Sequence, residues 1–194
     1  MPRLIRLAVI ALLAMAMPYG LSAQVSDALS YRLDADASEV SARVPFFGLS
    51  SKTARFPRME GTVSVVPEAP EQAVIDVTFD AAAIEAPDET TLRRLKGERF
   101  FWVERYPTIR FVGRSFDLDT PTSGRVTGQL TARGVTRTET LEVEFARDPT
   151  LAQGSSVSFT GRMEIDRREY GMRSYQLIVG NRVKIEINAQ MVPN

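Results

Sequence analysis

The chain has 194 residues, contains neither cysteine nor histidine, and balances 24 lysines and arginines against 24 aspartates and glutamates. Without cysteine it can form no disulfide, and without histidine it lacks the commonest general base and the commonest metal ligand. The near-neutral charge gives no reason to expect a nucleic-acid partner. Composition therefore disfavours most enzyme classes, and we expect no catalytic residue, no cofactor and no bound metal.

The first predicted element is a secretory signal peptide over residues 1–23. Arg3 and Arg6 precede the apolar run Leu7–Met17, and the small residue Ala23 follows a break in that run. The run is shorter than the about 20 apolar residues that span a membrane. We therefore predict export, cleavage near Ala23, and a single domain over residues 24–194.

Strands with one apolar face follow in chain order. Alternating apolar residues from Tyr31 to Val44 predict one long strand or a broken pair of strands. The same alternation recurs in seven further segments: Gly61–Val65, Ile75–Phe79, Ile109–Leu118, Val126–Ala132, Leu141–Phe145, Val157–Ile165 and Val183–Met191. Ile109 and Phe111 share one parity, whereas Phe116 and Leu118 share the other, so we predict a bulge near Gly113.

Two connections between these strands have their own signals. A turn around Gly134 joins two strands into a hairpin over Gly124–Phe145. The segment Pro87–Gly97 predicts a short helix that Asp88 caps and Gly97 ends. Glu98–Tyr106 has room for another turn before Pro107 stops it.

About eight antiparallel strands, each with one apolar face, form either a sandwich or a closed barrel. The single helical excursion favours the barrel. We predict an all-β, eight-stranded antiparallel barrel with a short helical lid segment. Periodicity alone does not say whether the interior is filled or hollow.

Four segments in order resemble motifs of the YceI-like family, the polyisoprenoid-binding proteins of the bacterial periplasm. They are Phe100–Phe111, Leu130–Arg137, Ile165–Met172 and Val179–Ile187, and the resemblance covers most of Tyr31–Val192. It implies a lipocalin-like barrel in the periplasm that encloses a long isoprenoid lipid, such as a polyprenyl phosphate or an isoprenoid quinone. On this interpretation the protein is a carrier and not an enzyme.

The candidate ligand-binding residues fall into two groups. Seven aromatic residues and one valine would line a lipid tunnel, with an ordinary filled core as the alternative for each: Phe46, Phe47, Phe79, Phe101, Trp102, Phe111, Phe159 and Val143. Arg167, Arg168 and Arg173, which flank Tyr170 and Gly171, would bind a phosphate head group, and of this group Tyr170, Arg167 and Arg173 are the candidate site residues. The alternative is a turn with solvated charges, in which Arg167 pairs with Asp166 or Glu169.

Other interpretations stay open at this point. Arg93, Arg94, Lys96 and Arg99 would face anionic lipid during transient contact with a membrane or a membrane protein, or would be a solvated helix face. The chain could also form a homodimer. The alternatives to a carrier are a filled-barrel adaptor module and an enzyme that acts on a small hydrophobic substrate through carboxylates. For such an enzyme the carboxylates on one stretch are Glu164, Asp166 and Glu169, although Glu164 and Asp166 share the outer face of their strand.

Overall fold

The computed structural model describes residues 28–66, 68–152 and 154–194, so the predicted signal peptide and its cleavage site lie outside the described residues. Ten strands are assigned within these ranges: β1 (Leu29–Leu33), β2 (Glu39–Phe46), β3 (Ser50–Arg55), β4 (Met59–Val66), β5 (Ala69–Asp80), β6 (Thr108–Thr120), β7 (Ser123–Ala132), β8 (Val135–Phe145), β9 (Val157–Asp166) and β10 (Arg182–Pro193). Four helical segments accompany them: η1 (Ala81–Ala83), α1 (Glu89–Lys96), η2 (Pro149–Leu151) and η3 (Arg167–Tyr170). Each helix of the described residues is too short or too polar to cross a bilayer.

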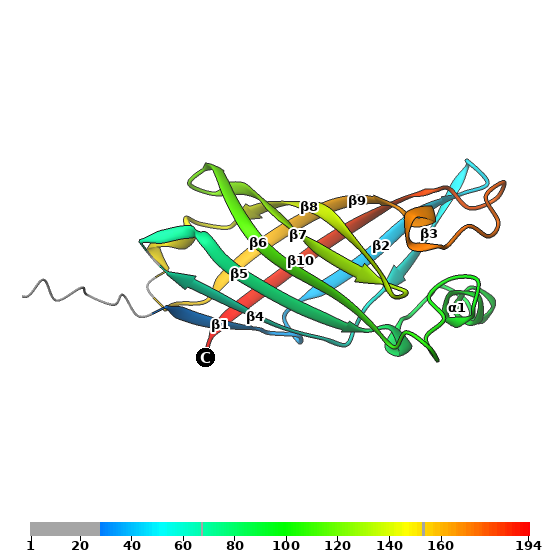
Figure 1. Cartoon of the computed structure of the whole chain (residues 1–194), viewed down its shortest axis with the longest axis horizontal. Helices are drawn as coiled ribbons and strands as arrows, with labels where there is room; N and C mark the ends of the chain where they lie inside the picture. The colour runs from blue at the N-terminus through cyan, green and yellow to red at the C-terminus, as the bar shows by residue number, and fades with distance from the viewer. Residues whose placement is uncertain (1–27, 67, 153) are drawn as a thin grey trace, which may run out of the picture.

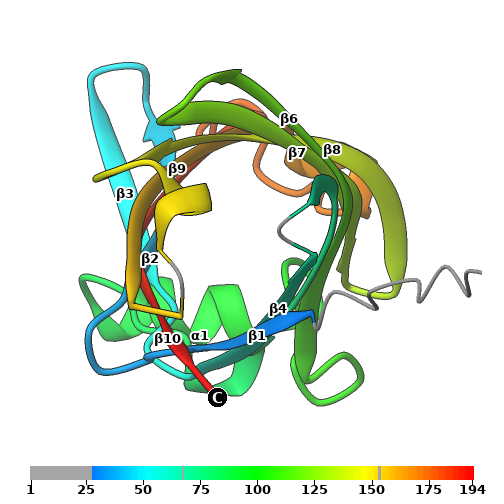
Figure 2. The same cartoon turned by 90° about the vertical axis from the view of Figure 1, so that its left-hand side faces the viewer.

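The strands close into an antiparallel barrel (Figures 1 and 2). Strands β4 to β10 form a ladder, and β1 pairs with both β4 and β10, which removes the free edges that a sandwich would keep. β2 pairs with β10 beyond the end of β1, and β3 pairs with β2. The ten assigned strands therefore fill eight positions around the barrel, because β1–β2 and β3–β4 are each one interrupted strand. The predicted closed barrel of eight strands is confirmed.

The interruption between β1 and β2 is a local turn held on β10. The hydroxyl of Ser38 donates to the carbonyl of Asp34 (2.6 Å) and accepts from the amide of Gln190 (3.1 Å). The amide of Asp34 donates to the carbonyl of Gln190 (2.9 Å). The chain thus leaves and rejoins the same neighbouring strand, which makes Tyr31–Val44 the broken pair that its sequence allowed.

The predicted bulge in β6 is present. The pairing with β7 shifts between Gly113 and Ser115, which lets Phe111 and Phe116 both point to the interior despite their different parity. Gly113 pairs with Gly128 on β7, and a Cβ on Gly128 would lie 2.7 Å from the ring of Phe111. Because Gly128 has no side chain, the ring of Phe111 can occupy the space beside its Cα.

The β7–β8 hairpin has the turn that its sequence predicts. Ala132 pairs with Val135, and the two residues between them, Arg133 and Gly134, have φ values of +51° and +72°. Two consecutive positive φ values define a type I′ turn, whose twist matches that of the flanking strands. Glycine suits the second position because it adopts positive φ without steric cost.

The lid helix α1 is confirmed with both of its predicted caps. The carboxylate of Asp88 accepts from the amide of Thr91 (2.8 Å), and the amide of Gly97 donates to the carbonyl of Arg93 (3.1 Å). Glu98–Tyr106 adds hydrogen-bonded turns and no regular helix. These turns carry Phe100 and Phe101 back toward the barrel.

The connections divide between two ends of the barrel (Figure 1). One end, here called the α1 end, holds α1, the β2–β3 turn, the β7–β8 turn and the Arg167–Asn181 connection between β9 and β10. The opposite end holds the β4–β5, β6–β7 and β8–β9 connections, with η2 in the last of these. This division follows from the antiparallel order, because successive turns alternate between the ends.

Candidate functional site: an apolar cavity along the barrel

A cavity of about 500 Å³ lies inside the barrel, and all ten strands contribute residues to its wall. The inward positions of each strand are mostly apolar because side chains alternate between the two faces of the sheet. Ligand pockets commonly have volumes of roughly 300–1,000 Å³. The barrel is therefore hollow enough to hold a ligand.

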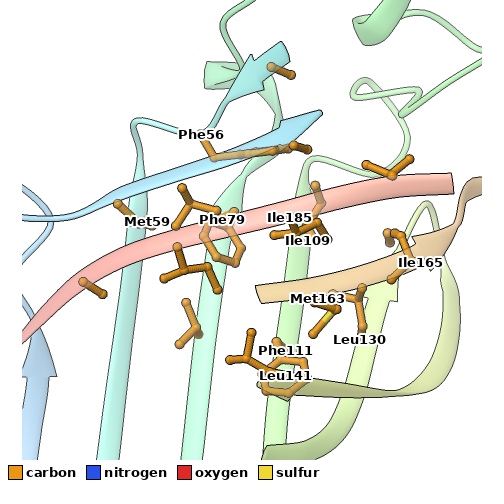
Figure 3. Close-up of a pocket in the computed structure, with 18 of the residues that line it drawn as sticks. Phe56, Met59, Phe79, Ile109, Phe111, Leu130, Leu141, Met163, Ile165 and Ile185 are labelled. Carbon is orange, nitrogen blue, oxygen red and sulfur yellow. The ribbon is translucent and has the colours of Figure 1, made fainter. Parts of the chain in front are cut away.

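Much of the cavity wall is formed by apolar side chains from seven strands and from the β3–β4 break (Figure 3). These are Phe56, Met59, Phe79, Ile109, Phe111, Leu130, Leu141, Met163, Ile165 and Ile185. Phe56 packs edge to face against Phe79 and Phe101, with ring centroids 5.9 and 6.1 Å apart. A wall of this kind has no polar group to orient a head group, so it suits a hydrocarbon chain.

The polar lining residues gather mainly at the α1 end. Lys52, Thr91, Arg94 and Tyr175 all border the cavity there. The ring of Tyr175 stacks on Phe100 (6.1 Å between centroids), while the guanidinium carbons of Arg94 and Arg99 lie 5.5 and 5.7 Å from its centroid. Arg99 also donates to the Tyr175 hydroxyl (3.0 Å). The α1 end thus offers cations and hydroxyls next to an apolar cavity.

An ion pair ties this polar group to the barrel. Lys52 on β3 pairs with Asp88, the cap of α1, at 2.8 Å. The hydrogen bond from Lys52 and those from Thr91 hold the pKa of Asp88 well below its usual range. Tyr175 has a φ of +58°, a strained value for a residue with a side chain, and strain of this kind often accompanies function.

Arg167 borders the cavity at the same end and is only 2% exposed. Its guanidinium donates to four backbone carbonyls, those of Met172, Ser174 (2.9 Å), Val179 (2.8 Å) and Gly180 (2.8 Å). Burial lowers the pKa of Arg167. The predicted pairing of Arg167 with Asp166 or Glu169 is wrong, because Asp166 pairs with Arg168 and Arg167 instead clamps the connection to β10.

Eight of the eleven predicted site residues line the cavity: Phe46, Phe47, Phe79, Phe101, Phe111, Val143, Phe159 and Arg167. Their contact with a ligand stays a prediction. Trp102, Tyr170 and Arg173 are not among the lining residues, and the reason differs for each.

Trp102 packs outside the cavity against Tyr106 (5.9 Å between ring centroids), under the guanidinium of Arg105. Tyr170 is fully buried, and its hydroxyl donates to Glu139 on β8 (2.7 Å). Burial and that hydrogen bond raise the pKa of Tyr170 far above its usual value. Arg173 is exposed on the connection that follows η3.

Sequence reasoning missed Lys52, Thr91 and Tyr175 as lining residues and assigned Arg94 to the outer surface. Thr91 and Arg94 lie on α1, and Tyr175 lies on the connection between β9 and β10, so none of these three belongs to a strand. Lys52 lies on β3, a strand whose sequence has almost no apolar alternation. No periodic signal could have placed them at the cavity. The basic and aromatic composition around Arg93–Trp102 was the available hint.

The carboxylates of the predicted cluster face away from the cavity. Glu164 pairs with Arg182 (2.7 Å), and the hydrogen bond from Arg168 lowers the pKa of Asp166 to about 2. No aspartate or glutamate is among the described residues that line the cavity. Within residues 28–66, 68–152 and 154–194, no group of three or more acidic side chains is placed to hold a metal ion.

A closed antiparallel barrel around an apolar cavity defines the lipocalin-like class of barrels. The model of the YceI-like domain matches residues 31–191, and the chain therefore belongs to the YceI-like family. A UPF0312 protein of Staphylococcus aureus is 29% identical over 123 residues, which cover 58% of this chain and 68% of that protein. A UPF0312 protein of Pseudomonas putida is 25% identical over 158 residues, which cover 79% of this chain and 81% of its own length.

Solved structures share the fold. BcnA of Burkholderia cenocepacia matches with a TM-score of 0.72 and 24% identity, over 81% of this chain and 98% of BcnA. A polyisoprenoid-binding domain from Saccharophagus degradans matches with a TM-score of 0.65 and 14% identity, over 86% of this chain and 99% of that domain. At these identities the likeness concerns the fold alone.

Proposed function

We propose that the protein is a periplasmic carrier or sequestering protein that encloses an isoprenoid lipid and performs no catalysis. The observation that carries the proposal is the apolar cavity of about 500 Å³ inside a closed barrel. Membership of the YceI-like family and the shared fold with a polyisoprenoid-binding domain support a lipid ligand. The N-terminal sequence, with Arg3 and Arg6 before the apolar run Leu7–Met17, supports export.

The energetics favour a hydrocarbon tail as the main source of affinity. Burial contributes about 0.8 kcal/mol per methylene, so a ~20-carbon tail offers roughly 16 kcal/mol before the costs of ordering and association. A hydrogen bond between the head group and a charged side chain contributes about 1.5–3 kcal/mol. The tail would therefore set affinity, and polar residues at the α1 end such as Arg94 and Lys52 would set selectivity between a phosphate and a quinone.

The two alternatives have less support. A filled-barrel adaptor would have no need of a cavity, whereas here Val143 and its neighbours on β8 border one. An enzyme with carboxylate chemistry would need an aspartate or glutamate beside the substrate, and the described lining residues include neither. Both observations favour a carrier.

The test is to introduce a large side chain at one position of the cavity wall. Val143 is 5% exposed on the inner face of β8, and Glu144 is its exposed neighbour on the outer face. We expect Val143→Trp to keep the fold and to abolish co-purified lipid, because the indole occupies the space of the tail. Glu144→Trp, the matched control, should retain the lipid.

The measurements are native mass spectrometry of protein purified from the periplasm, solvent extraction of the bound molecule, and the melting temperature. Overpacking a filled core typically costs about 1–3 kcal/mol. A destabilised Val143→Trp variant, together with a parent protein that never carries lipid, would reject the carrier in favour of the filled-barrel adaptor.

A further inference from the structure

The α1 end carries exposed apolar side chains on two adjacent segments. Phe47 and Leu49 at the β2–β3 turn are 62% and 97% exposed, and Leu177 on the connection to β10 is 100% exposed. The amide of Phe47 donates to the carbonyl of Ile178 (2.8 Å), so the two segments lie side by side (Figure 1). Exposed apolar groups that gather at one place mark an interaction surface. We call Phe47, Leu49 and Leu177 the apolar tip.

Basic residues flank the apolar tip. The ten residues from Arg43 to Lys52 contain two basic side chains and no acidic one. Arg93 and Lys96 lie on α1, which the Lys52–Asp88 ion pair ties to β3. Arg173 lies four residues before Leu177.

These cations are available to a partner. Among the described residues, no ion pair involves Arg93, Lys96 or Arg173. The acidic residues of the connections over residues 81–107 and 167–181 are Glu85, Glu89, Glu98, Glu104 and Glu169, besides the paired Asp88. Cationic side chains around exposed apolar ones suit an anionic lipid surface, where the cations meet head groups and the apolar side chains enter the acyl boundary.

The opposite end has the reverse charge. Its three connections and the adjoining strand ends carry more acidic than basic residues. The basic residues there are Arg125 and Arg147. The acidic residues are Glu68, Glu71, Asp117, Asp119, Glu142, Glu144 and Asp148. Leu151 of η2 is 72% exposed there, on the same end of the barrel as these carboxylates. An anionic surface would therefore attract one end of the barrel and repel the other.

The apolar tip is continuous with the cavity. Phe47 and Ile178 both line the cavity, while Phe47 is also more than half exposed to solvent. A hydrocarbon chain that passes between the cavity and the outside at this point stays in contact with apolar side chains. A chain that leaves the cavity beside Phe47 would therefore pass the apolar tip.

We propose that the α1 end docks on an anionic lipid surface, with Leu49 and Leu177 in the acyl boundary and Arg93, Lys96 and Arg173 at the head groups. Docking in this orientation turns the cavity toward the bilayer. Because it depends on the outer surface, the docking can be tested whatever molecule the cavity holds.

Vesicle co-sedimentation of the exported protein tests the docking. We expect binding to vesicles of phosphatidylcholine with phosphatidylglycerol, weak binding to phosphatidylcholine alone, and a loss of binding as salt is raised. The variants L49S/L177S and R93Q/K96Q/R173Q should each bind the anionic vesicles about tenfold less tightly or worse. None of these five residues lines the cavity, so the bound lipid should be retained.

The matched controls are L151S, at the acidic end, and R32Q/R162Q, on exposed positions of β1 and β9. Both should bind anionic vesicles like the parent protein. Equal losses in the controls and in the α1-end variants would overturn the proposal, as would a parent protein that binds neither kind of vesicle.

A site-specific label gives the orientation directly. Because the chain has no cysteine, Ser50→Cys at the start of β3, next to the β2–β3 turn, and Thr122→Cys at the β6–β7 turn each provide one labelling site. A polarity-sensitive fluorophore at position 50 should shift to the blue on anionic vesicles, and the same fluorophore at position 122 should not. A shift at position 122 alone would contradict docking through the α1 end.

Discussion

The two ends of the barrel are held together by different kinds of hydrogen bonds. At the α1 end, arginine side chains join distant backbone segments: Arg167 binds four carbonyls of the connection to β10, and Arg133 donates to Gly171 and Glu98 (2.9 Å each). At the opposite end, the bonds are mostly local, such as those from the amide and hydroxyl of Thr150 to Asp148 (2.9 and 2.6 Å).

The length of the connections explains this difference. The connections at the opposite end are shorter than the two long ones at the α1 end, and they satisfy backbone groups within the strand ladder or with a neighbouring side chain. The connections over residues 81–107 and 167–181 leave more carbonyls without ladder partners, and long guanidinium side chains reach them. The α1 end therefore has its stability concentrated in a few side chains, and single substitutions there should do more damage.

The largest effect should come from Arg167→Ala. The change leaves four carbonyls without their donor, at about 1–3 kcal/mol for each one that water does not reach, so we expect the free energy of unfolding to fall by on the order of 4 kcal/mol. Arg168→Ala removes only an exposed pair with Asp166 and should cost less than about 1 kcal/mol. Urea denaturation measures both. Equal stability of the two variants would show that Arg167 is no clamp.

A glycine substitution at each end should give a smaller and graded effect. Gly134 and Gly154 have φ values of +72° and +81°, where a side chain costs about 1–2 kcal/mol. A Cβ on Gly134 would lie 2.6 Å from the Tyr106 ring, whereas nothing lies within 4 Å of one on Gly154. Gly134→Ala should therefore destabilise the protein more than Gly154→Ala, by about 1–3 kcal/mol for the forced repacking.

Urea denaturation also measures the loss of stability in the two glycine variants. If Gly154→Ala proves as costly as Gly134→Ala, the contact with Tyr106 adds nothing, and the α1 end is no more tightly packed than the opposite end.

The smallest effect should be a loss of local stability at the α1 end as the pH is lowered. The pKa of Asp88 is lowered mainly by its hydrogen bond with Lys52, and that of Asp166 is lowered to about 2 by Arg168. Because both folded-state pKa values lie below the unfolded value of about 3.9, the stabilisation is complete well above that pH and is lost as the pH falls below about 4. With no histidine in the chain, stability should stay level between about pH 5 and 8.

Hydrogen exchange across α1 and the β6–β7 turn measures this loss of local stability. Protection of the α1 amides should decrease first as the pH is lowered. Asp88→Asn should lower that protection at neutral pH, and its difference from the parent should narrow below about pH 4. A parent protein whose two ends lose protection together would show that the Asp88 cap does not control the α1 end.

The sequence determined the features that depend on neighbouring residues. Alternation predicts which face of β7, β8 and β9 is apolar, the change of parity predicts the bulge at Gly113, and Asp88 and Gly97 predict the ends of α1. Each of these rests on backbone geometry within a few residues, so the chain carries the information locally.

Only the tertiary structure decided what lies opposite each apolar face. Periodicity reports that Phe111 and Val143 point inward, but the pairing of β1 with β10 and the volume left between the walls decide that the interior holds a cavity. The polar residues beside that cavity come from positions as distant as Lys52, Arg94 and Tyr175, mostly in irregular segments that have no period. Burial of Arg167 is likewise invisible in sequence, because a charged side chain is buried only where folding brings enough carbonyl oxygens around it.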